Sequence, residues 1–223
     1  MTKPAALLAL LALASAPIPA RPQAAGDPGA PVAGQPAANA DLQAEDEPPE
    51  PRRSRWYVGA GLGYGDGAVS WAGESWSLGR YMDASPSRLA LALEGGWQVA
   101  TRLRVGLDLT WLRARGSRGG VASSVDLLQP GVAAAFYPFE RGLFVRAAAG
   151  YARLDSGYDA PWAHSSAAHD GFGLTGGIGY ALAVWGPLDA FARIEATHQW
   201  YGSTPERIES ATTWAAYGGV LWF

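Results

Sequence analysis

The chain has 223 residues and a formal net charge of −3, and only 17% of its residues are charged. It contains no long basic run, so nucleic acid is not an expected partner. It contains no cysteine, which excludes disulfides and thiol catalysis. Beyond the N-terminus, no apolar stretch reaches the roughly 18 residues of a membrane-spanning helix. A membrane protein of this composition would therefore have to be a β-barrel.

The first twenty residues have the pattern of a secretory signal peptide. Lys3 precedes an apolar run from about Ala5 to Ala14, and small residues follow. Cleavage after Ala16 or after Ala20 remains open. We therefore expect a signal peptide over residues 1–20.

Residues 21–54 are rich in proline, alanine and glycine and contain no large apolar cluster. Such a segment cannot bury enough surface to order itself, so we expect a disordered periplasmic linker. The simplest role is a tether that leads into the next domain. The alternative is an arm that contacts peptidoglycan or a partner.

From Trp56 onward, larger apolar side chains alternate with small ones, which is the period of a β-strand. The alternation recurs in eight segments, near residues 56–65, 87–98, 102–114, 122–137, 143–154, 171–184, 188–201 and 211–223. In the fourth segment Pro130 leaves the phase ambiguous. In the eighth we expect Tyr217, Leu221 and Phe223 on one face, with Phe223 directed outward.

The connections between these segments alternate in length. Tight joins are expected near residues 99–101, 138–142 and 185–187, and long ones at 66–86, 155–170 and 202–210. The remaining external connection, near 115–121, is the exception in being short. Short periplasmic turns and longer external loops are typical of outer-membrane barrels.

Aromatic residues gather at the ends of the segments, as in a lipid-facing band between two interfaces. The periplasmic belt is expected to comprise Trp56, Trp97 and Phe223, and the opposite belt Tyr64, Trp111, Tyr151, Phe172 and Trp200. The small-residue face carries five charges, namely Glu94, Asp108, Arg146, Arg193 and Glu195. Inside a barrel of eight strands these groups would meet and should pair. Tyr57, Phe144, Phe191 and Trp222 would narrow the periplasmic end of the lumen.

Together these patterns predict an all-β protein: an eight-stranded antiparallel up-and-down transmembrane β-barrel over residues 55–223. The segments YVGAGLGYG (57–65), YPFERGLFVRAAAGYA (137–152) and YGGVLWF (217–223) resemble small outer-membrane barrels related to the outer membrane protein A transmembrane domain and to outer membrane protein X. The ending also resembles the signal read by the barrel assembly machinery, with Gly218, Leu221 and Phe223 in the matching positions. Ala216 departs from it, where a polar residue is usual. The resemblance implies an outer-membrane monomer surrounded by lipid and lipopolysaccharide.

Three histidines are the obvious candidates for catalysis. The His-x-Ser form of His164-Ser165-Ser166 resembles that of lipid A deacylase, but no glutamate follows at a suitable spacing and Asp170 is a poor substitute. We expect His164 and His169 in an external loop and His198 on the outward face near the interface. No catalytic residue, metal site or cofactor is therefore expected. The glycines of residues 59–65 alternate along a strand, which does not suit a nucleotide loop.

Three arginines, Arg113, Arg115 and Arg118, flank the short external connection. At the level of the outer leaflet they could contact lipopolysaccharide phosphates, the alternative being ordinary solvated side chains. The five interior charges could form a proton or ion path, or a network that plugs the barrel.

We expect a non-enzymatic barrel with a structural role in the envelope or a surface-interaction role through its external loops. Aromatic residues in those loops, such as Trp71, Trp76, Tyr158 and Trp162, are candidates for contacting a surface ligand. The alternatives are a narrow channel or transporter for small or apolar solutes, and a lipid A-modifying enzyme.

Overall fold

The computed structural model describes residues 55–139, 142–202 and 208–223. The signal peptide and linker predicted for residues 1–54 lie outside the described residues. No helix in the described part of the chain is long and apolar enough to cross a membrane.

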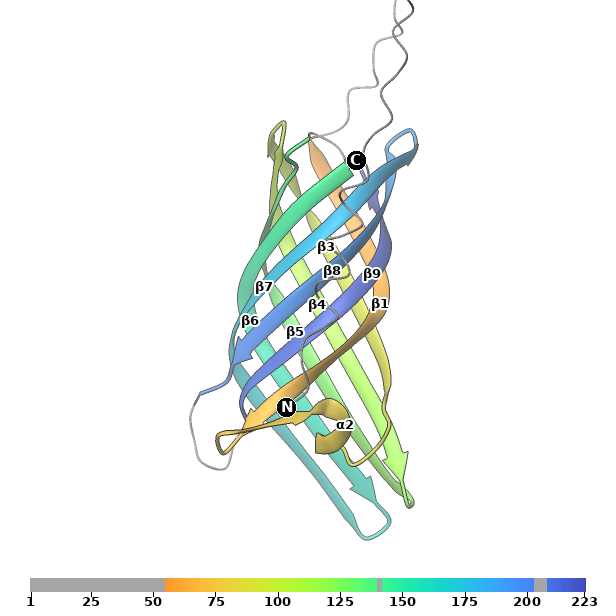
Figure 1. Cartoon of the computed structure of the whole chain (residues 1–223), viewed down its shortest axis with the longest axis vertical. Helices are drawn as coiled ribbons and strands as arrows, with labels where there is room; N and C mark the ends of the chain where they lie inside the picture. Colours follow the sequence, from red (N-terminus) through yellow and green to blue (C-terminus); the bar gives the residue numbers. More distant parts are fainter. Residues whose placement is uncertain (1–54, 140–141, 203–207) are drawn as a thin grey trace, which may run out of the picture. The chain divides into compact units, whose positions relative to one another are not determined.

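Eight long strands form a closed antiparallel barrel (Figure 1). They are β1 (Trp56–Trp71), β3 (Ser87–Ala100), β4 (Leu103–Arg118), β5 (Val121–Phe136), β6 (Gly142–Ala160), β7 (Ala163–Trp185), β8 (Leu188–Trp200) and β9 (Ile208–Trp222). Each pairs with its neighbour in the chain, and β9 pairs back with β1 from Val58↔Trp222 to Trp71↔Ile208. Closure leaves no sheet edge unpaired within lipid. The predicted fold class is confirmed.

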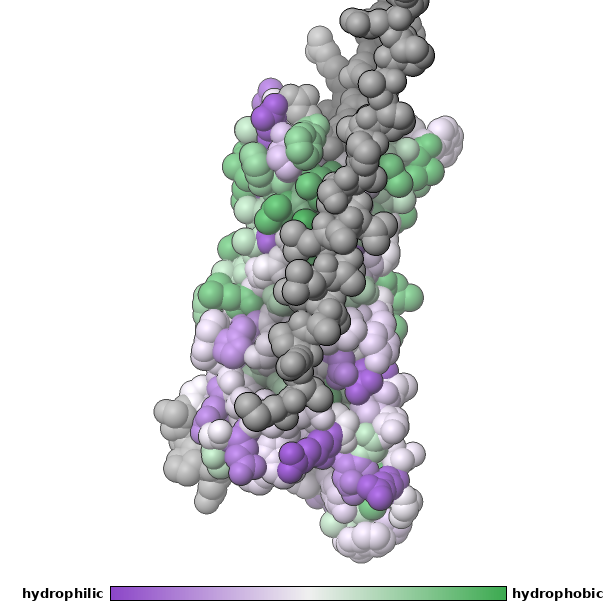
Figure 2. Space-filling view, viewed as in Figure 1, coloured by the Kyte–Doolittle hydropathy of each residue, from purple (hydrophilic) through white to green (hydrophobic). Residues whose placement is uncertain are grey.

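The faces of the strands follow the predicted alternation. Leu62, Leu107 and Ile178 lie on the outer wall and are exposed, whereas Ala90 and Phe144 point into the lumen and are buried. The hydropathy view shows apolar residues gathered on the half of the barrel that carries the tight turns, and polar residues on the other half (Figure 2). The apolar half is the lipid-facing band.

The register resolves the phase of the fourth strand. Val125, Leu127 and Gln129 face the lumen, while Val132 and Phe136 face outward. Pro130 pairs with Leu109 on β4, but the ladder to β6 passes from Leu128↔Arg153 to Gly131↔Gly150 without it. A proline has no N–H to donate, so this break in the ladder is expected.

The predicted orientation of the last strand is wrong. Tyr217, Leu221 and Phe223 do share a face, but it is the inner one, and Phe223 is only 5% exposed. Trp222, expected inside, is 51% exposed on the lipid side. The reason is the register, because Trp222 lies opposite outward Val58 and Leu221 lies opposite inward Gly59. The periplasmic belt is therefore completed by Trp222 in place of Phe223.

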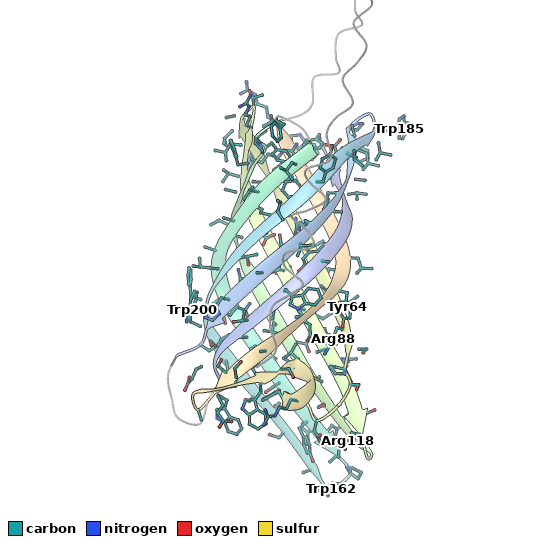
Figure 3. The ribbon with its side chains drawn as sticks, viewed as in Figure 1. Tyr64, Arg88, Arg118, Trp162, Trp185 and Trp200 are labelled. Atoms are coloured by element: carbon teal, nitrogen blue, oxygen red, sulfur yellow. The ribbon has the colours of Figure 1, made fainter. Side chains whose placement is uncertain are left out.

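Two of the expected external loops are strands. Residues 155–170 continue β6 and β7 in register up to Ala160↔Ala163, and only Gly119 and Gly120 separate β4 from β5. Both glycines have positive φ, which a tight turn of this kind requires. Both faces of these strand extensions lie outside the membrane, so polar residues occupy both. This composition is the reason why the sequence predicted loops here. We call residues 155–170 the projection; Trp162 lies at its tip, far from the level of Trp200 (Figure 3).

The first external connection is also ordered. After Trp71 the chain turns and forms β2 (Glu74–Ser77), which pairs with the end of β1, and then the single turn α2 (Leu78–Tyr81). The Ser77 side chain accepts a hydrogen bond from the Arg80 amide at 3.3 Å, which caps this turn. In the expected connection at 202–210, residues 203–207 lie outside the described part.

Candidate functional site

The five predicted charges meet in the middle of the lumen. Arg146 lies 2.6 Å from Glu195, contacts Asp108 and approaches Glu94 at 4.0 Å. Arg193 lies 2.9 Å from Glu94 and 3.0 Å from Glu195. No side chain of the five is more than 9% exposed. We call this set the charge cluster.

The charge cluster crosses the lumen from wall to wall. Its carboxylates come from β3, β4 and β8 and its guanidinium groups from β6 and β8, so it ties four strands together. Glu94 and Asp108 lie opposite each other in the β3–β4 register, where Arg146 contacts Asp108 and Arg193 contacts Glu94. Ionised groups buried this deeply need such partners, since an unpaired one costs several kcal/mol.

An arginine that the sequence reasoning missed fills the periplasmic end. Arg104 donates to the Tyr137 hydroxyl at 2.7 Å, and its guanidinium lies 4.2 Å from the Tyr137 ring and 4.5 Å from the Phe223 ring. The Tyr57 ring lies 6.4 Å from that of Phe223. The signal was available, because Arg104 has the same strand parity as inward Asp108.

Amide and hydroxyl groups fill the lumen on the outer side of the charge cluster. Gln129 donates to Thr175 at 3.1 Å and accepts from Gln199 at 3.2 Å. Thr175 also contacts Thr197 at 2.9 Å. Tyr201 donates to Gln199, and burial raises the pKa of the Tyr201 phenol above its ordinary value.

The expected loop position of His169 is wrong. It lies on the inward face of β7, is 8% exposed, and its ring is 6.3 Å from that of Tyr201. His164 also lies in β7 but is exposed. His198 has the expected outward position, 2.7 Å from the Thr212 hydroxyl and edge-on to Trp200.

An apolar plug closes the external mouth. Leu78 of α2 is fully buried and Met82 is 8% exposed, in one cluster with Val69, Val125 and Leu154. The Ser123 hydroxyl donates to the Met82 carbonyl at 3.2 Å and attaches the segment to β5. Buried side chains therefore occupy the lumen around Arg104, at the charge cluster, around Gln129 and beside Leu78.

The three arginines predicted near the outer leaflet are not brought together. Arg113 lies 3.3 Å from Asp126, with its guanidinium 5.5 Å from the Trp111 ring of the outer belt. Arg118 pairs with Asp83 at 2.5 Å near the end of β4, and Arg115 is exposed between them. The sequence reasoning missed Arg88, which donates to the Tyr64 hydroxyl of the same belt at 2.7 Å (Figure 3).

The terminal residues of the predicted assembly signal lie along β9. Gly218 faces outward with open space around it, whereas Leu221 is buried in the lumen. The Phe223 amide donates to the Pro187 carbonyl at 2.9 Å, which fixes the end of the chain to the turn before β8.

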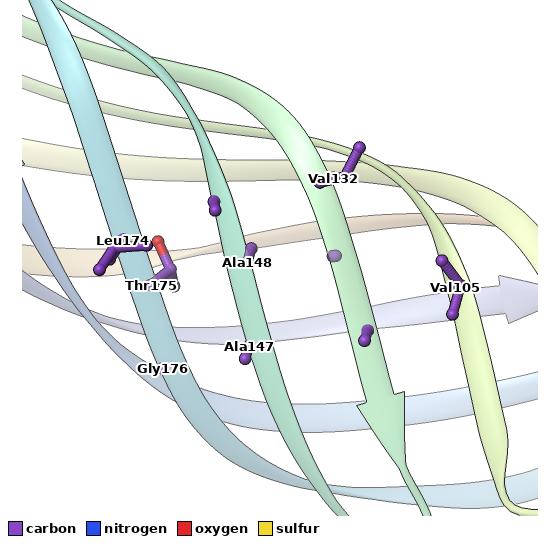
Figure 4. A pocket seen from close by; sticks show the side chains of 10 residues that line it. Val105, Val132, Ala147, Ala148, Leu174, Thr175 and Gly176 are labelled. Carbon is purple, nitrogen blue, oxygen red and sulfur yellow. The ribbon is translucent and has the colours of Figure 1, made fainter.

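A hollow of about 480 Å³ lies on the outer wall across β4 to β7 (Figure 4). Small residues form its floor, with Ala147 opposite Gly176 in the register, and Val105, Val132 and Leu174 rise around it. It opens within the apolar band, where lipid acyl chains would occupy it. In the described part of the chain no group of three metal-ligating side chains occurs.

No protein-family model and no curated protein matches the chain. Among solved structures, the attachment invasion locus protein Ail of Yersinia pestis, in complex with the heparin analogue sucrose octasulfate, has a TM-score of 0.53 at 11% identity. That match covers 76% of this chain and 100% of Ail. Neisserial surface protein A has a TM-score of 0.49 at 16% identity, over 76% of this chain and 97% of its own. By its closed barrel, its apolar band and its likeness to Ail, the chain has the fold of the small eight-stranded outer-membrane β-barrels.

Proposed function

We propose that this protein is a non-enzymatic surface-binding barrel of the outer membrane, closed to solutes, whose projection contacts extracellular ligands. The main support for this proposal is the length of the projection. Beyond the belt pair Tyr151↔Phe172, β6 and β7 continue as a paired ribbon for nine further residues each. At about 3.4 Å per residue this is roughly 30 Å of strand outside the lipid.

The composition of the projection suits contact with a partner. Tyr158 is 41% exposed and Trp162 is 74% exposed, in a part of the molecule that no acyl chain reaches. Exposed aromatic residues on a rigid scaffold are common at binding surfaces. An ordered ribbon loses little conformational entropy when it binds.

The filled lumen supports closure to solutes. Arg104 with its aromatic neighbours, the charge cluster and the α2 plug obstruct the lumen at three levels. One observation supports the alternative of a narrow channel: polar side chains line the lumen from the charge cluster to Gln129 and Gln199. Planar-bilayer recordings of the purified barrel separate the two: we expect no conductance steps, and regular steps would overturn the proposal.

Three finer expectations belong to the same proposal. The barrel is a monomer whose N-terminal linker lies in the periplasm. The barrel assembly machinery reads Gly218, Leu221 and Phe223. Arg113 is the best placed of the predicted arginines for a lipopolysaccharide phosphate, because it lies beside the Trp111 ring at the interface.

A truncation tests the surface-binding role. Residues 157–166 are deleted and the strands rejoined by an Asn-Gly turn, which suits a two-residue hairpin. We expect cells that display this variant to lose the binding that wild-type cells show to arrays of glycans and matrix proteins. Heat modifiability on gels checks insertion, and a lipid A mass shift in cells expressing the wild type would contradict the non-enzymatic role. Equal binding by both barrels would refute the role of the projection.

A further inference from the structure

A crevice with a volume of about 380 Å³ lies on the external side, between the α2 segment and the projection. Tyr81 and Asp83 line one wall, and Ser123, Ser156, Tyr158 and Ser165 line the other. Its size falls in the range of small-molecule sites, about 300–1,000 Å³. It is separate from the filled lumen and from the acyl-facing hollow.

The strand register builds the projection wall of the crevice. Ser123 of β5 lies opposite Tyr158 of β6, which lies opposite Ser165 of β7. Ser123 is two residues from inward Val125, so this row continues the lumen face of the barrel above the membrane. Adjacent strands lie about 4.8 Å apart, so three hydroxyl-bearing side chains stand side by side on a rigid sheet.

The opposite wall is held in place by two contacts. Ser123 donates to the Met82 carbonyl, and Arg118 pairs with Asp83 at 2.5 Å. Asp83 adopts a φ of 48°, in the left-handed region that an aspartate tolerates better than most residues. Residues other than glycine that are held in this region tend to occur at functional sites.

The chemistry of the lining selects a class of ligand. Serine and tyrosine hydroxyls both donate and accept hydrogen bonds, and the rings of Tyr81 and Tyr158 offer apolar surface for stacking. Among the described lining residues, Asp83 is the only acidic or basic one, and it pairs with Arg118. An acyl chain would leave the hydroxyls unpaired, and a polyanion would lie against a carboxylate. A ring that carries hydroxyls and also presents C–H faces can hydrogen-bond with the serine and tyrosine hydroxyls and stack on the tyrosine rings.

We propose that this crevice binds a neutral saccharide unit of an extracellular glycan. The proposal rests on the surface-binding function and names its ligand class. Tyr158 stacks on the sugar ring, the Ser165 hydroxyl exchanges hydrogen bonds with ring hydroxyls, and the Ser123 hydroxyl, which donates to the Met82 carbonyl, accepts one. Asp83 accepts from a sugar hydroxyl while Arg118 keeps it in position.

The test uses the full-length mature protein in lipid nanodiscs on an array of neutral oligosaccharides, with sulfated and sialylated counterparts beside them. Mammalian glycans and bacterial surface oligosaccharides form separate arms, which identify the source. We expect saturable binding to neutral members of one arm. Absence of any neutral binder, or a preference for the sulfated forms, would overturn the proposal.

Matched variants then locate the site by calorimetry with the best neutral binder. We expect Tyr158→Ala to weaken binding at least tenfold, with Tyr158→Phe retaining part of the affinity. Ser165→Ala should weaken it several-fold. Ser166→Ala, on the opposite face of the same strand, should leave it unchanged. Equal effects of the two serine variants would refute the crevice.

The outcomes separate this proposal from the broader function. If Tyr158→Ala binds normally while the truncation of residues 157–166 abolishes binding, the crevice is wrong and the surface-binding function stands. If the truncation also binds normally, both are wrong. Tyr158 is 41% exposed and contributes little to the barrel core, so we expect its variants to fold. Heat modifiability on gels checks the folding of each variant.

Discussion

Arg146 is the side chain on which the charge cluster depends. It contacts Asp108 and Glu195 and approaches Glu94, with 1% of its own side chain exposed. Removing it takes away the cation that contacts Asp108 and leaves Glu94 and Glu195 to share Arg193. We predict that Arg146→Met lowers the free energy of unfolding by about 3–5 kcal/mol, the usual cost of breaking a buried pair. Urea unfolding in lipid vesicles, followed by tryptophan fluorescence, measures it.

The matched control for that experiment is Arg118→Met. Its pair with Asp83 is 72% and 82% exposed, and water screens such a pair strongly. The unfolding midpoint of this variant should stay within experimental error of the wild type. If both variants unfold alike, the charge cluster does not stabilise the barrel.

Phe223 has two separable roles at the end of the chain. Its ring packs inside against Arg104 and Tyr57, so Phe223→Ala should lower the stability of the purified, refolded barrel by about 3 kcal/mol. If the terminal aromatic were only an assembly signal, the refolded variant would match the wild type and only insertion in cells would slow. We expect both losses, measured by vesicle unfolding and by the inserted fraction in cells. Trp222→Ala, which alters the lipid face alone, is the comparison.

At the scale of elements, alternation in the sequence predicts the strands well. The reason is that the lipid outside requires apolar side chains, whereas the packed lumen inside takes small or polar ones. The same contrast identifies the five charges of the cluster. It fails for β9, where Trp222 and Phe223 are both large and only the register to Val58 decides which faces lipid. It also fails for residues 155–170, since a ribbon that is wet on both faces has the composition of a loop.

The crevice could not be predicted at all from local pattern. Ser123, Tyr158 and Ser165 are distant in sequence and become neighbours only through the register of three strands. Their opposite wall depends on how the chain folds after β2. Long-range pairing of this kind carries no periodic signal, because each residue is unremarkable in its own segment.

The α2 segment should act as a cover for the outer lumen. Val125 is fully buried and belongs to the same apolar cluster as Leu78 and Met82. The chain has no cysteine, so Val125→Cys introduces a single thiol. We predict slow reaction of this thiol with a maleimide in the intact barrel, and a rate at least tenfold higher when residues 74–84 are replaced by a Gly-Ser linker. Equal rates in the two proteins would show that the segment does not cover the mouth.

At the scale of the whole molecule, the even number of strands places Trp56 and Phe223 at the same end as the tight turns. The tight-turn end carries the apolar band, and the opposite end carries the projection. This asymmetry favours a position with the apolar half in the lipid and the polar half outside it. The strands extend beyond the apolar band on the side that the loop lengths predict to be external. Strand length therefore supports the same orientation as loop length.

Single-cysteine labelling on intact cells tests that orientation. Asp159→Cys, in the projection, should react with a membrane-impermeant maleimide from outside. Thr101→Cys, in the exposed turn between β3 and β4, should react only after the outer membrane is permeabilised. Leu107→Cys, at a position 68% exposed on the lipid face, should react in neither case, because thiolate does not form in hydrocarbon. The reverse pattern for Asp159→Cys and Thr101→Cys would place the projection in the periplasm, where it could not meet an extracellular ligand.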